Sequence, residues 1–379
     1  MRIVHLSRFK LGTVNGSYNA LWSLACAQAD RGHDVALIRV GKPAAPSHEE
    51  FAASRGVRLI GFPCPMWRGF WTDRTGALQR IIRGLRPDIA HLSYVRIPKF
   101  AYIARLLQRE QIPYVISPHG GLLSDEMVRR KSRKLAYWHG IEKRVHLRAA
   151  AIHFVSSHEQ RDYYATLGLA RPLDVVIPNA VELPTALPKW KGLVEPTRPN
   201  LAYFGRYDVW HKGIDLALAM LRALSTQGIR GELHLHGRGF TQEMDSLRRS
   251  FPEIRMVDHG YVGGLEKYEL MACYDLYLQY SRFEVFGLSL AEAMAIGLPA
   301  VISERSDLAA DLVSRRAAIR IPMDPAAAAS VVRGILERPG VLADVSAKGR
   351  EWVRSEYDPS RVAEEMERFY TQVLDGSRP

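Results

Sequence analysis

The chain has 379 residues, of which 47% are hydrophobic and 24% are charged, a composition typical of a soluble globular protein rather than a disordered one. This length is sufficient for two domains of ordinary size, and no apolar run approaches the roughly 18 residues that a membrane-spanning helix needs. The three cysteines are scattered and have neither metal-ligand spacing nor the pattern of a disulfide framework. We therefore expect a protein of the reducing cytoplasm.

The net charge of +12 belongs to the first half of the chain. Residues 1–182 contain 27 basic and 14 acidic residues, whereas residues 183–379 contain 25 and 26. This asymmetry indicates an anionic partner for the first half, such as phospholipid, a diphosphate-linked acceptor or nucleic acid.

The first elements predict a βαβ unit. Residues 3–6 are apolar and predict a buried parallel strand, being too short for the core of a secretory signal. A loop with Gly12 and Gly16 leads to a helix over residues 18–31 and a strand over residues 33–38. These glycines either only permit the turn or place their N–H groups near a donor diphosphate or an acceptor.

Further alternation of strands and helices leads to His119. Residues 113–117 predict a strand, and His119 follows at its carboxyl end, where doubly wound sheets bind ligands. A structural role is the alternative for a single histidine. Residues 151–157 predict another strand, whose last serines cap a helix starting near Glu159. A strand over residues 175–179 closes the first domain before a proline-rich linker.

Basic residues with interleaved aromatics occupy residues 129–148. Such a pattern on helices suits an anionic membrane surface or a lipid-diphosphate acceptor. Nucleic acid is compatible with this charge, and a solvated helical face would explain it equally simply. We take membrane contact as the hypothesis to test.

The second half begins with a predicted strand over residues 200–205, followed by Arg206, a loop to Lys212 and a helix over residues 214–224. A departing nucleoside diphosphate gains negative charge as the glycosidic bond breaks. Two cations fixed beside it would stabilise that transition state more than the ground state. For either residue alone, a surface charge is the simpler interpretation.

The stretch 281–303 has the most specific pattern. Glu284 and Glu292 lie eight positions apart, on either side of a helix start formed by Phe286, Gly287 and Leu288. The helix is predicted to run to residue 296, because a glycine and a proline then stop it. Free N–H groups at its start form an anion site, and a carboxylate on each side can accept hydrogen bonds from hydroxyls. A nucleotide sugar has this arrangement of groups; two surface acids favoured by the helix dipole are the alternative.

This stretch resembles the Glu-x7-Glu signature of retaining nucleotide-sugar glycosyltransferases of the GT-B fold, a family 4-like group that includes bacterial polysaccharide and lipopolysaccharide enzymes. The resemblance runs weakly from near residue 3 and strongly from residue 205 to residue 303. The matching residues are Ser281, Glu284, Phe286, Gly287, Leu288, Glu292, Ala293, Ala295, Gly297 and Pro299.

The resemblance implies a role for each candidate residue. Glu292 is expected to hold the ribose hydroxyls, and Glu284 the hydroxyls of the transferred sugar. His119, in its Pro-His-Gly setting, is expected to hydrogen-bond the donor sugar near the reacting carbon. Tyr261 and Val262 are expected to lie behind the nucleobase.

The diphosphate is expected to contact Arg206, Lys212 and the amides of Gly287 and Leu288. No metal motif appears, and these cations with the helix start can substitute for a divalent ion, so no cofactor is expected. The gap between Arg206 and Lys212 is one residue longer than the family's commonest form. Gly16 is followed by Ser17 where the family has two adjacent glycines.

Taken together, we predict an α/β protein of two Rossmann-like, doubly wound domains facing a cleft. Residues 1–182 form an acceptor domain and residues 183–359 a donor domain, with a helix over about 360–379 crossing back to the first. The predicted function is transfer of a sugar, with retention, from a nucleotide sugar to a glycan or lipid-linked acceptor in cell-surface polysaccharide synthesis.

The predicted location is the cytoplasm or the inner face of its membrane, with no nucleic-acid partner. Two alternatives are a nucleotide-sugar epimerase of the same fold and a non-catalytic basic protein that binds membrane or nucleic acid through residues 129–148.

Overall fold

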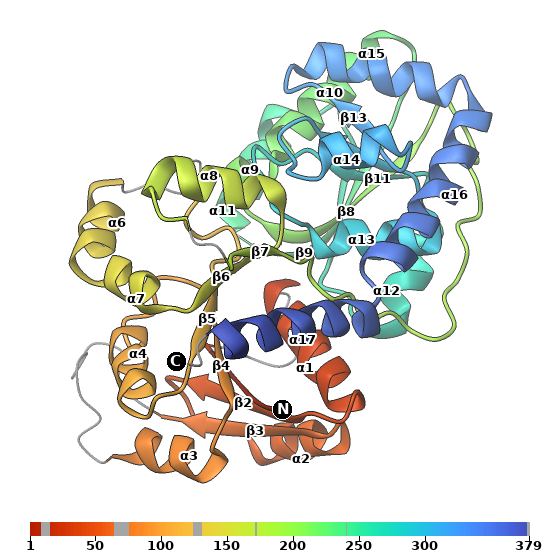
Figure 1. The fold of residues 1–379 in the computed structure, drawn as a ribbon. Helices are drawn as coiled ribbons and strands as arrows, with labels where there is room; N and C mark the ends of the chain where they lie inside the picture. Colours follow the sequence, from red (N-terminus) through yellow and green to blue (C-terminus); the bar gives the residue numbers. More distant parts are fainter. Residues whose placement is uncertain (9–15, 64–75, 124–130, 171–172, 240, 377–379) are drawn as a thin grey trace. The chain divides into compact units, whose positions relative to one another are not determined.

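The computed structural model describes residues 1–8, 16–63, 76–123, 131–170, 173–239 and 241–376, which form two compact units (Figure 1). The first unit comprises Met1–Ala180 and Tyr357–Pro379, and the second comprises Val181–Glu356. Each unit has its own parallel sheet with helices around it. Gly12 and residues 129–130, named in the sequence predictions, lie outside the described residues.

The sheet of the first unit has the strand order β3-β2-β1-β4-β5-β6-β7. Its strands, all parallel to their neighbours, are β1 (Arg2–Ser7), β2 (Asp34–Val40), β3 (Val57–Phe62), β4 (Ile89–Ser93), β5 (Tyr114–Ser117), β6 (Ala151–Phe154) and β7 (Val175–Val176). The strand order reverses between β1 and β4, so the carboxyl ends of these strands mark the edge where a doubly wound sheet binds ligands.

Helices cover both faces of this sheet. They are α1 (Gly16–Asp30), α2 (Pro46–Ser54), α3 (Ala77–Leu85), α4 (Phe100–Arg109), α6 (Lys131–Tyr137), the π-helix η1 (Trp138–Glu142), α7 (Lys143–Arg148), α8 (Ser157–Leu167) and α17 (Pro359–Gly376). Because side chains alternate along a strand, Ile3 of β1 packs with α1 and α17, whereas Val4 and Leu6 pack with α3 and α4 on the other face. Burial on both faces explains why the strands read as short apolar runs.

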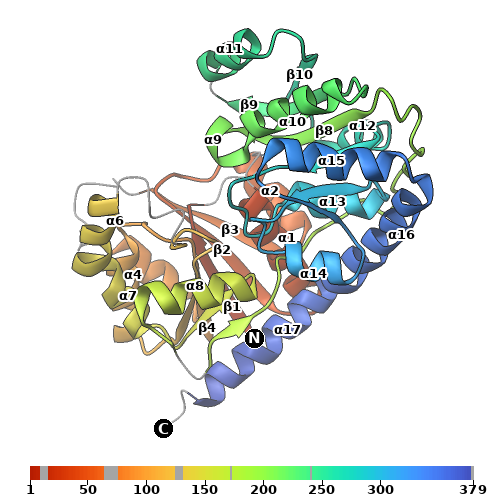
Figure 2. The same ribbon diagram turned by 90° about the horizontal axis from the view of Figure 1, so that it is seen from above.

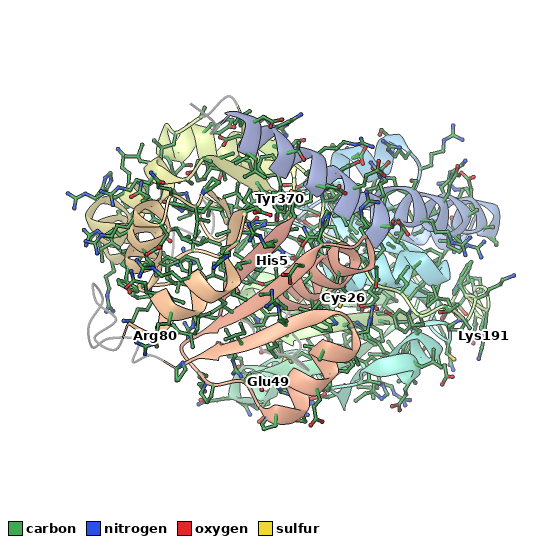
Figure 3. All side chains as sticks on the ribbon, turned by 60° about the horizontal axis from the view of Figure 1, so that its bottom comes forward. His5, Cys26, Glu49, Arg80, Lys191 and Tyr370 are labelled. Carbon is green, nitrogen blue, oxygen red and sulfur yellow. The ribbon has the colours of Figure 1, made fainter. Side chains whose placement is uncertain are left out.

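Helix α17 returns the chain to the first unit and packs against α1 (Figure 1, Figure 2). Its apolar side is fully buried, with Met366, Phe369 and Tyr370 in the same cluster as Ile3 of β1. Tyr370 and His5, both labelled in Figure 3, are buried side chains of this region.

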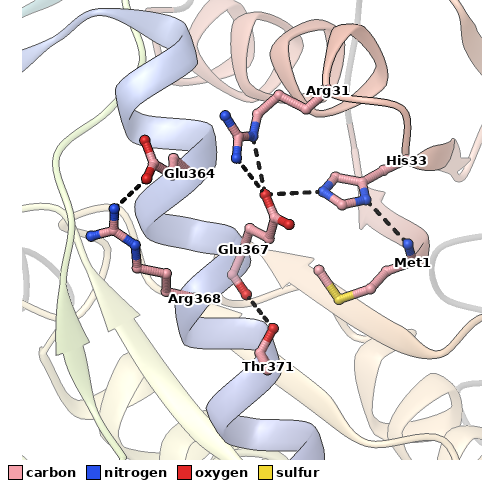
Figure 4. Close-up of polar contacts among 7 residues, drawn as sticks. All are labelled: Met1, Arg31, His33, Glu364, Glu367, Arg368 and Thr371. Atoms are coloured by element: carbon pink, nitrogen blue, oxygen red, sulfur yellow. Dashed lines mark hydrogen bonds and ion pairs between the residues drawn. The ribbon is translucent and has the colours of Figure 1, made fainter.

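A polar contact reinforces this packing. Glu367 of α17 accepts hydrogen bonds from Arg31 at 2.7 and 3.0 Å and lies 3.4 Å from Nε2 of His33 (Figure 4).

The second unit has a six-stranded sheet of order β10-β9-β8-β11-β12-β13. Its strands are β8 (Asn200–Tyr207), β9 (Glu232–Gly239), β10 (Met256–Gly260), β11 (Leu276–Gln279), β12 (Ala300–Ser303) and β13 (Ile319–Ile321). The helices are α9 (Val209–Lys212), α10 (Ile214–Thr226), α11 (Thr241–Ser250), α12 (Gly264–Met271), α13 (Leu288–Ile296), α14 (Ala309–Ser314), α15 (Pro325–Leu336) and α16 (Pro339–Glu356). Here the order reverses between β8 and β11, and the loops after these two strands carry the densest predicted motif residues.

Candidate active site

The loop after β8 contains a one-turn helix that places Lys212. Asp208 caps α9, because its Oδ1 accepts the N–H of His211 at 3.1 Å and its backbone oxygen accepts the N–H of Lys212 at 2.8 Å. Gly213 then ends the turn at φ +63°, and a Cβ there would lie 2.0 Å from the backbone oxygen of Tyr280. Only glycine fits this position, so the lengthened gap between Arg206 and Lys212 is a defined turn.

Lys212 and Glu284 form an ion pair, and their side chains are only 15% and 13% exposed. Ser281 also donates to Oε2 of Glu284 at 3.2 Å. Burial alone would raise the pKa of Glu284, but the adjacent Lys212 ammonium, together with His211 and the hydrogen bond from Ser281, outweighs it and holds the pKa below its usual value. Glu284 is therefore an ionised carboxylate at neutral pH.

His211 holds the loop that carries Glu284. Burial and the neighbouring Lys212 lower the pKa of His211 to about 4, so its ring is neutral. Nε2 of this ring lies 2.9 Å from the backbone oxygen of Phe283 and must donate to it, and the two rings stack at 4.0 Å. The loop is thus fixed before any ligand arrives.

Helix α13 begins where the sequence predicts. Gly287 is its N-cap at φ +69°, and a Cβ there would lie 2.2 Å from Nε2 of Gln279 and 3.5 Å from Cγ of Glu284. Among the described residues, no acceptor takes the N–H of Gly287 or Leu288, so both remain available to an anion. Phe286 is only 6% exposed and serves as packing under the loop.

The second motif acid, Glu292, has a partner that no sequence pattern indicated. Lys267 of α12 forms an ion pair with its Oε2, and the hydroxyl of Tyr268 lies 3.4 Å from its Oε1. Lys267 precedes a tyrosine in an ordinary helical stretch, so only the approach of α12 to α13 identifies it.

Arg206 and Tyr261 are the exposed members of the predicted set. Arg206 makes no hydrogen bond through its guanidinium to any described residue, and it lies opposite Arg238 in the β8–β9 pair. The guanidinium of Arg238 lies 5.3 Å from the ring centre of Tyr261, which is 42% exposed. Val262 beside it is half-buried.

In the first unit, Gly16 is the first residue of α1 rather than part of a loop before it. His119 lies after β5 in a turn with positive φ, and its ring lies 4.9 Å from that of Tyr94. Burial and the nearby His153 lower the pKa of His119 to about 3. The ring is therefore neutral and can act as a hydrogen-bond partner, but not as an acid.

His119 borders a cavity of about 10 Å³, roughly the space of one water. A buried chain of hydrogen bonds lines it. His153 donates through Nε2 to the oxygen of Ile177 at 2.8 Å, so its Nδ1 must accept from Ser117 at 2.6 Å. Ser117 in turn accepts from Nε2 of His91 at 2.5 Å, which leaves Nδ1 of His91 to accept from Tyr370 at 2.6 Å. The donor or acceptor role of each group in this chain is therefore fixed by the role of the group before it.

The chain matches two family models, one for each half. Residues 15–180 match the glycosyl transferase 4-like domain, and residues 198–338 match the glycosyl transferases group 1 domain. It is 27% identical to a phosphatidyl-myo-inositol mannosyltransferase of Mycolicibacterium smegmatis, over 98% of this chain and 94% of that one. It is 25% identical to a GDP-mannose:cellobiosyl-diphosphopolyprenol alpha-mannosyltransferase of Xanthomonas oryzae, over 80% and 79%.

Its structure is similar to that of a sucrose-phosphate synthase from Thermosynechococcus elongatus, with a TM-score of 0.75, 17% identity and 99% coverage of both chains. The two parallel-sheet units thus have the GT-B fold. The chain is a glycosyltransferase that contains a glycosyl transferase 4-like domain and a group 1 domain, as the Glu-x7-Glu resemblance indicated.

No helix in the described part of the chain is long and apolar enough to cross a bilayer. Within the same residues, no group of three or more His, Cys, Asp or Glu side chains is arranged to hold a metal ion.

Proposed function

We propose that this glycosyltransferase moves a hexose from a nucleoside-diphosphate sugar to a lipid-linked or glycan acceptor, with retention at the anomeric carbon. The observation that carries the proposal is the Lys212–Glu284 ion pair beside the free amides of Gly287 and Leu288. A cation, a carboxylate and a helix start lie within one loop cluster, which is the set of groups that a phosphate next to a sugar requires.

In the proposed mechanism, Lys212, Arg206 and the α13 amides neutralise the charge that the leaving diphosphate gains as the glycosidic bond breaks. Glu284 accepts hydrogen bonds from hydroxyls of the transferred sugar, and Glu292 from those of the ribose. His119, being neutral, exchanges a hydrogen bond with the sugar. The acceptor attacks from the face that the diphosphate leaves, and the leaving phosphate takes the acceptor's proton. These side-chain cations perform the role that a divalent ion has in other transferases.

The names of the two mannosyltransferase relatives support the choice of acceptor, because one names an inositol phospholipid and the other a diphosphopolyprenol. GDP-mannose, named for the second, is the first donor to test. Incubation with GDP-mannose or UDP-glucose and a diphosphopolyprenol glycan should give a product heavier by one hexose, and the anomeric coupling of that product tests retention. Isomerisation of the donor without an acceptor would instead identify an epimerase.

Membrane docking through residues 131–148 is part of the proposal. The exposed residues of α6, η1 and α7 include basic side chains and one leucine: Arg133, His139, Arg144, Arg148 and Leu147. Such a face suits anionic headgroups. Binding to anionic vesicles should fall with salt and with Arg144→Glu/Arg148→Glu, whereas cosedimentation that ignores these residues would contradict docking here.

A further inference from the structure

The turn that carries His119 has an unfavourable backbone. Gly121 donates its N–H to the oxygen of Pro118 at 3.2 Å, which closes a four-residue turn. His119 and Gly120 occupy its two central positions at φ +51° and +75°, the combination of a type I′ turn. For a residue with a Cβ, the left-handed region costs roughly 1–2 kcal/mol. Such a conformation persists only where surrounding contacts impose it.

One such contact comes from Glu159, in the first turn of α8. Its Oε1 accepts the N–H of Gly120 at 2.5 Å, and its Oε2 accepts the N–H of Val155 at 2.9 Å. The residue is only 2% exposed. Ser156 and Glu159 have the spacing of a capping box, and Ser156 does accept the N–H of Glu159 at 3.0 Å. The Glu159 carboxylate of this capping-box pair also reaches across to the His119 turn.

A second contact comes from the loop after β4. The guanidinium of Arg96 donates to the backbone oxygen of Gly121, and the backbone N–H of Arg96 donates to Oε1 of Glu142, which is only 5% exposed. Arg96 itself has φ +55°. A Cβ on Gly121 would lie 2.3 Å from Cγ2 of Val95, so this loop presses directly on the turn.

We infer that Glu159 and Arg96 are positioning residues for His119, which hold the two residues that follow it in the turn and so set where its imidazole meets the donor sugar. Glu159 orients the Gly120 peptide, and Arg96 orients the Gly121 peptide. Hydrogen bonds to the next two residues, Gly120 and Gly121, thereby hold His119 in its strained conformation. The inference rests on the proposed function in one respect only, namely that His119 contacts the sugar.

The test compares Glu159→Gln and Arg96→Gln with Glu49→Gln. Glu49 is also a first-turn acid of the first unit, but it is exposed and no contact of its carboxylate with another described residue is seen. In Glu159→Gln, one carboxylate oxygen is replaced by an NH₂ group, which cannot accept a hydrogen bond. One of the two backbone N–H groups, that of Gly120 or that of Val155, therefore loses its acceptor. A glutamine at 96 cannot reach Gly121 as the guanidinium does.

Two readouts are measured on the full chain. The ring resonances of ¹⁵N-labelled histidines, with His119 assigned by its loss in His119→Asn, report the imidazole environment. Both glutamine variants should shift the His119 resonance and lower kcat about tenfold or more, because a misplacement of about 1 Å can cost roughly 10²-fold. The Kd for GDP should stay within about twofold, since the proposed nucleotide contacts all lie in the second unit. Glu49→Gln should change neither readout.

The inference is overturned if the His119 resonance does not shift in folded Glu159→Gln. It is also overturned if the control Glu49→Gln loses as much kcat as Glu159→Gln does. Should Glu159→Gln fail to fold, Arg96→Gln decides by the same criteria. Failure of the wild type to transfer a hexose from either GDP-mannose or UDP-glucose would reject the proposed function, yet the resonance arm would still decide whether these residues position His119.

Discussion

In the second unit, the candidate site contains two ion pairs, Lys212 with Glu284 and Lys267 with Glu292. In the first unit, His119 is neutral and borders a buried chain of neutral hydrogen bonds, on a backbone turned into the left-handed region. The second unit thus has fixed charges for a ligand that itself carries charge. The first relies on orientation, because neutral groups stabilise a ligand only when their hydrogen bonds are aimed correctly.

This contrast predicts that removing a charge will cost most in the second unit. Lys212→Met leaves the Glu284 carboxylate buried without its cation and removes a group that stabilises the leaving diphosphate. We expect kcat/KM to fall by about 10²–10³, and the acid limb of its pH profile to move upward as the pKa of Glu284 rises. Steady-state kinetics across pH test both, with exposed Lys189→Met as the control. Equal losses in both variants would contradict a specific role for Lys212.

In the first unit, removing a group from the buried hydrogen-bond chain should lower the free energy of unfolding. Ser117 and Ser93 lie opposite each other in the β4–β5 pair, and both are buried. Ser117 bridges two histidines, whereas Oγ of Ser93 has no hydrogen-bond partner among the described residues. Ser117→Ala should cost about 2–4 kcal/mol of unfolding free energy, because it leaves two imidazole nitrogens unpaired, and Ser93→Ala should cost almost nothing. Denaturant titration of both variants measures the difference. Similar losses of unfolding free energy in the two variants would contradict a special role for the Ser117 hydrogen bonds.

The buried acid Glu142 gives the first unit a pH dependence. Burial raises its pKa from 4.5 to about 7, against the opposing effect of Arg96. Between these values the folded state holds a proton that the unfolded state has lost, so the unfolding free energy falls as pH rises through this window. The whole effect is at most about 3 kcal/mol. Glu142→Gln should therefore gain stability relative to wild type at pH 8 compared with pH 5, and parallel pH curves for the two proteins would contradict this.

The smallest effect should come from the surface ion pair between Glu367 of α17 and Arg31, which follows the last residue of α1. Arg31 and Glu367 are 30% and 33% exposed, and pairs of this kind contribute about 0.2–1 kcal/mol. Glu367→Gln should lower the unfolding free energy by that amount, and less in 1 M salt, where charges are screened. A larger, salt-independent loss would mean that packing of α17 depends on this contact more than on its apolar face.

The sequence by itself determined the alternation of strands and helices, the start of α13 at Leu288 and its end before Gly297, because these depend on local periodicity and on glycine and proline. It also identified the family through residues 281–303, since their chemistry lies within one contiguous stretch.

Only the tertiary structure decided which groups meet. Lys267 reaches Glu292 from another helix, Glu159 reaches the His119 turn from α8, and Arg96 reaches it from the loop after β4. The sequence does not predict these partners, because each contact joins residues of different elements whose separation along the chain follows no regular period. The direction of the Tyr370–His91–Ser117–His153 chain likewise follows from where four elements converge. Local sequence patterns determine where helices and strands form, whereas the packing of these elements determines which side chains form hydrogen bonds and ion pairs with one another.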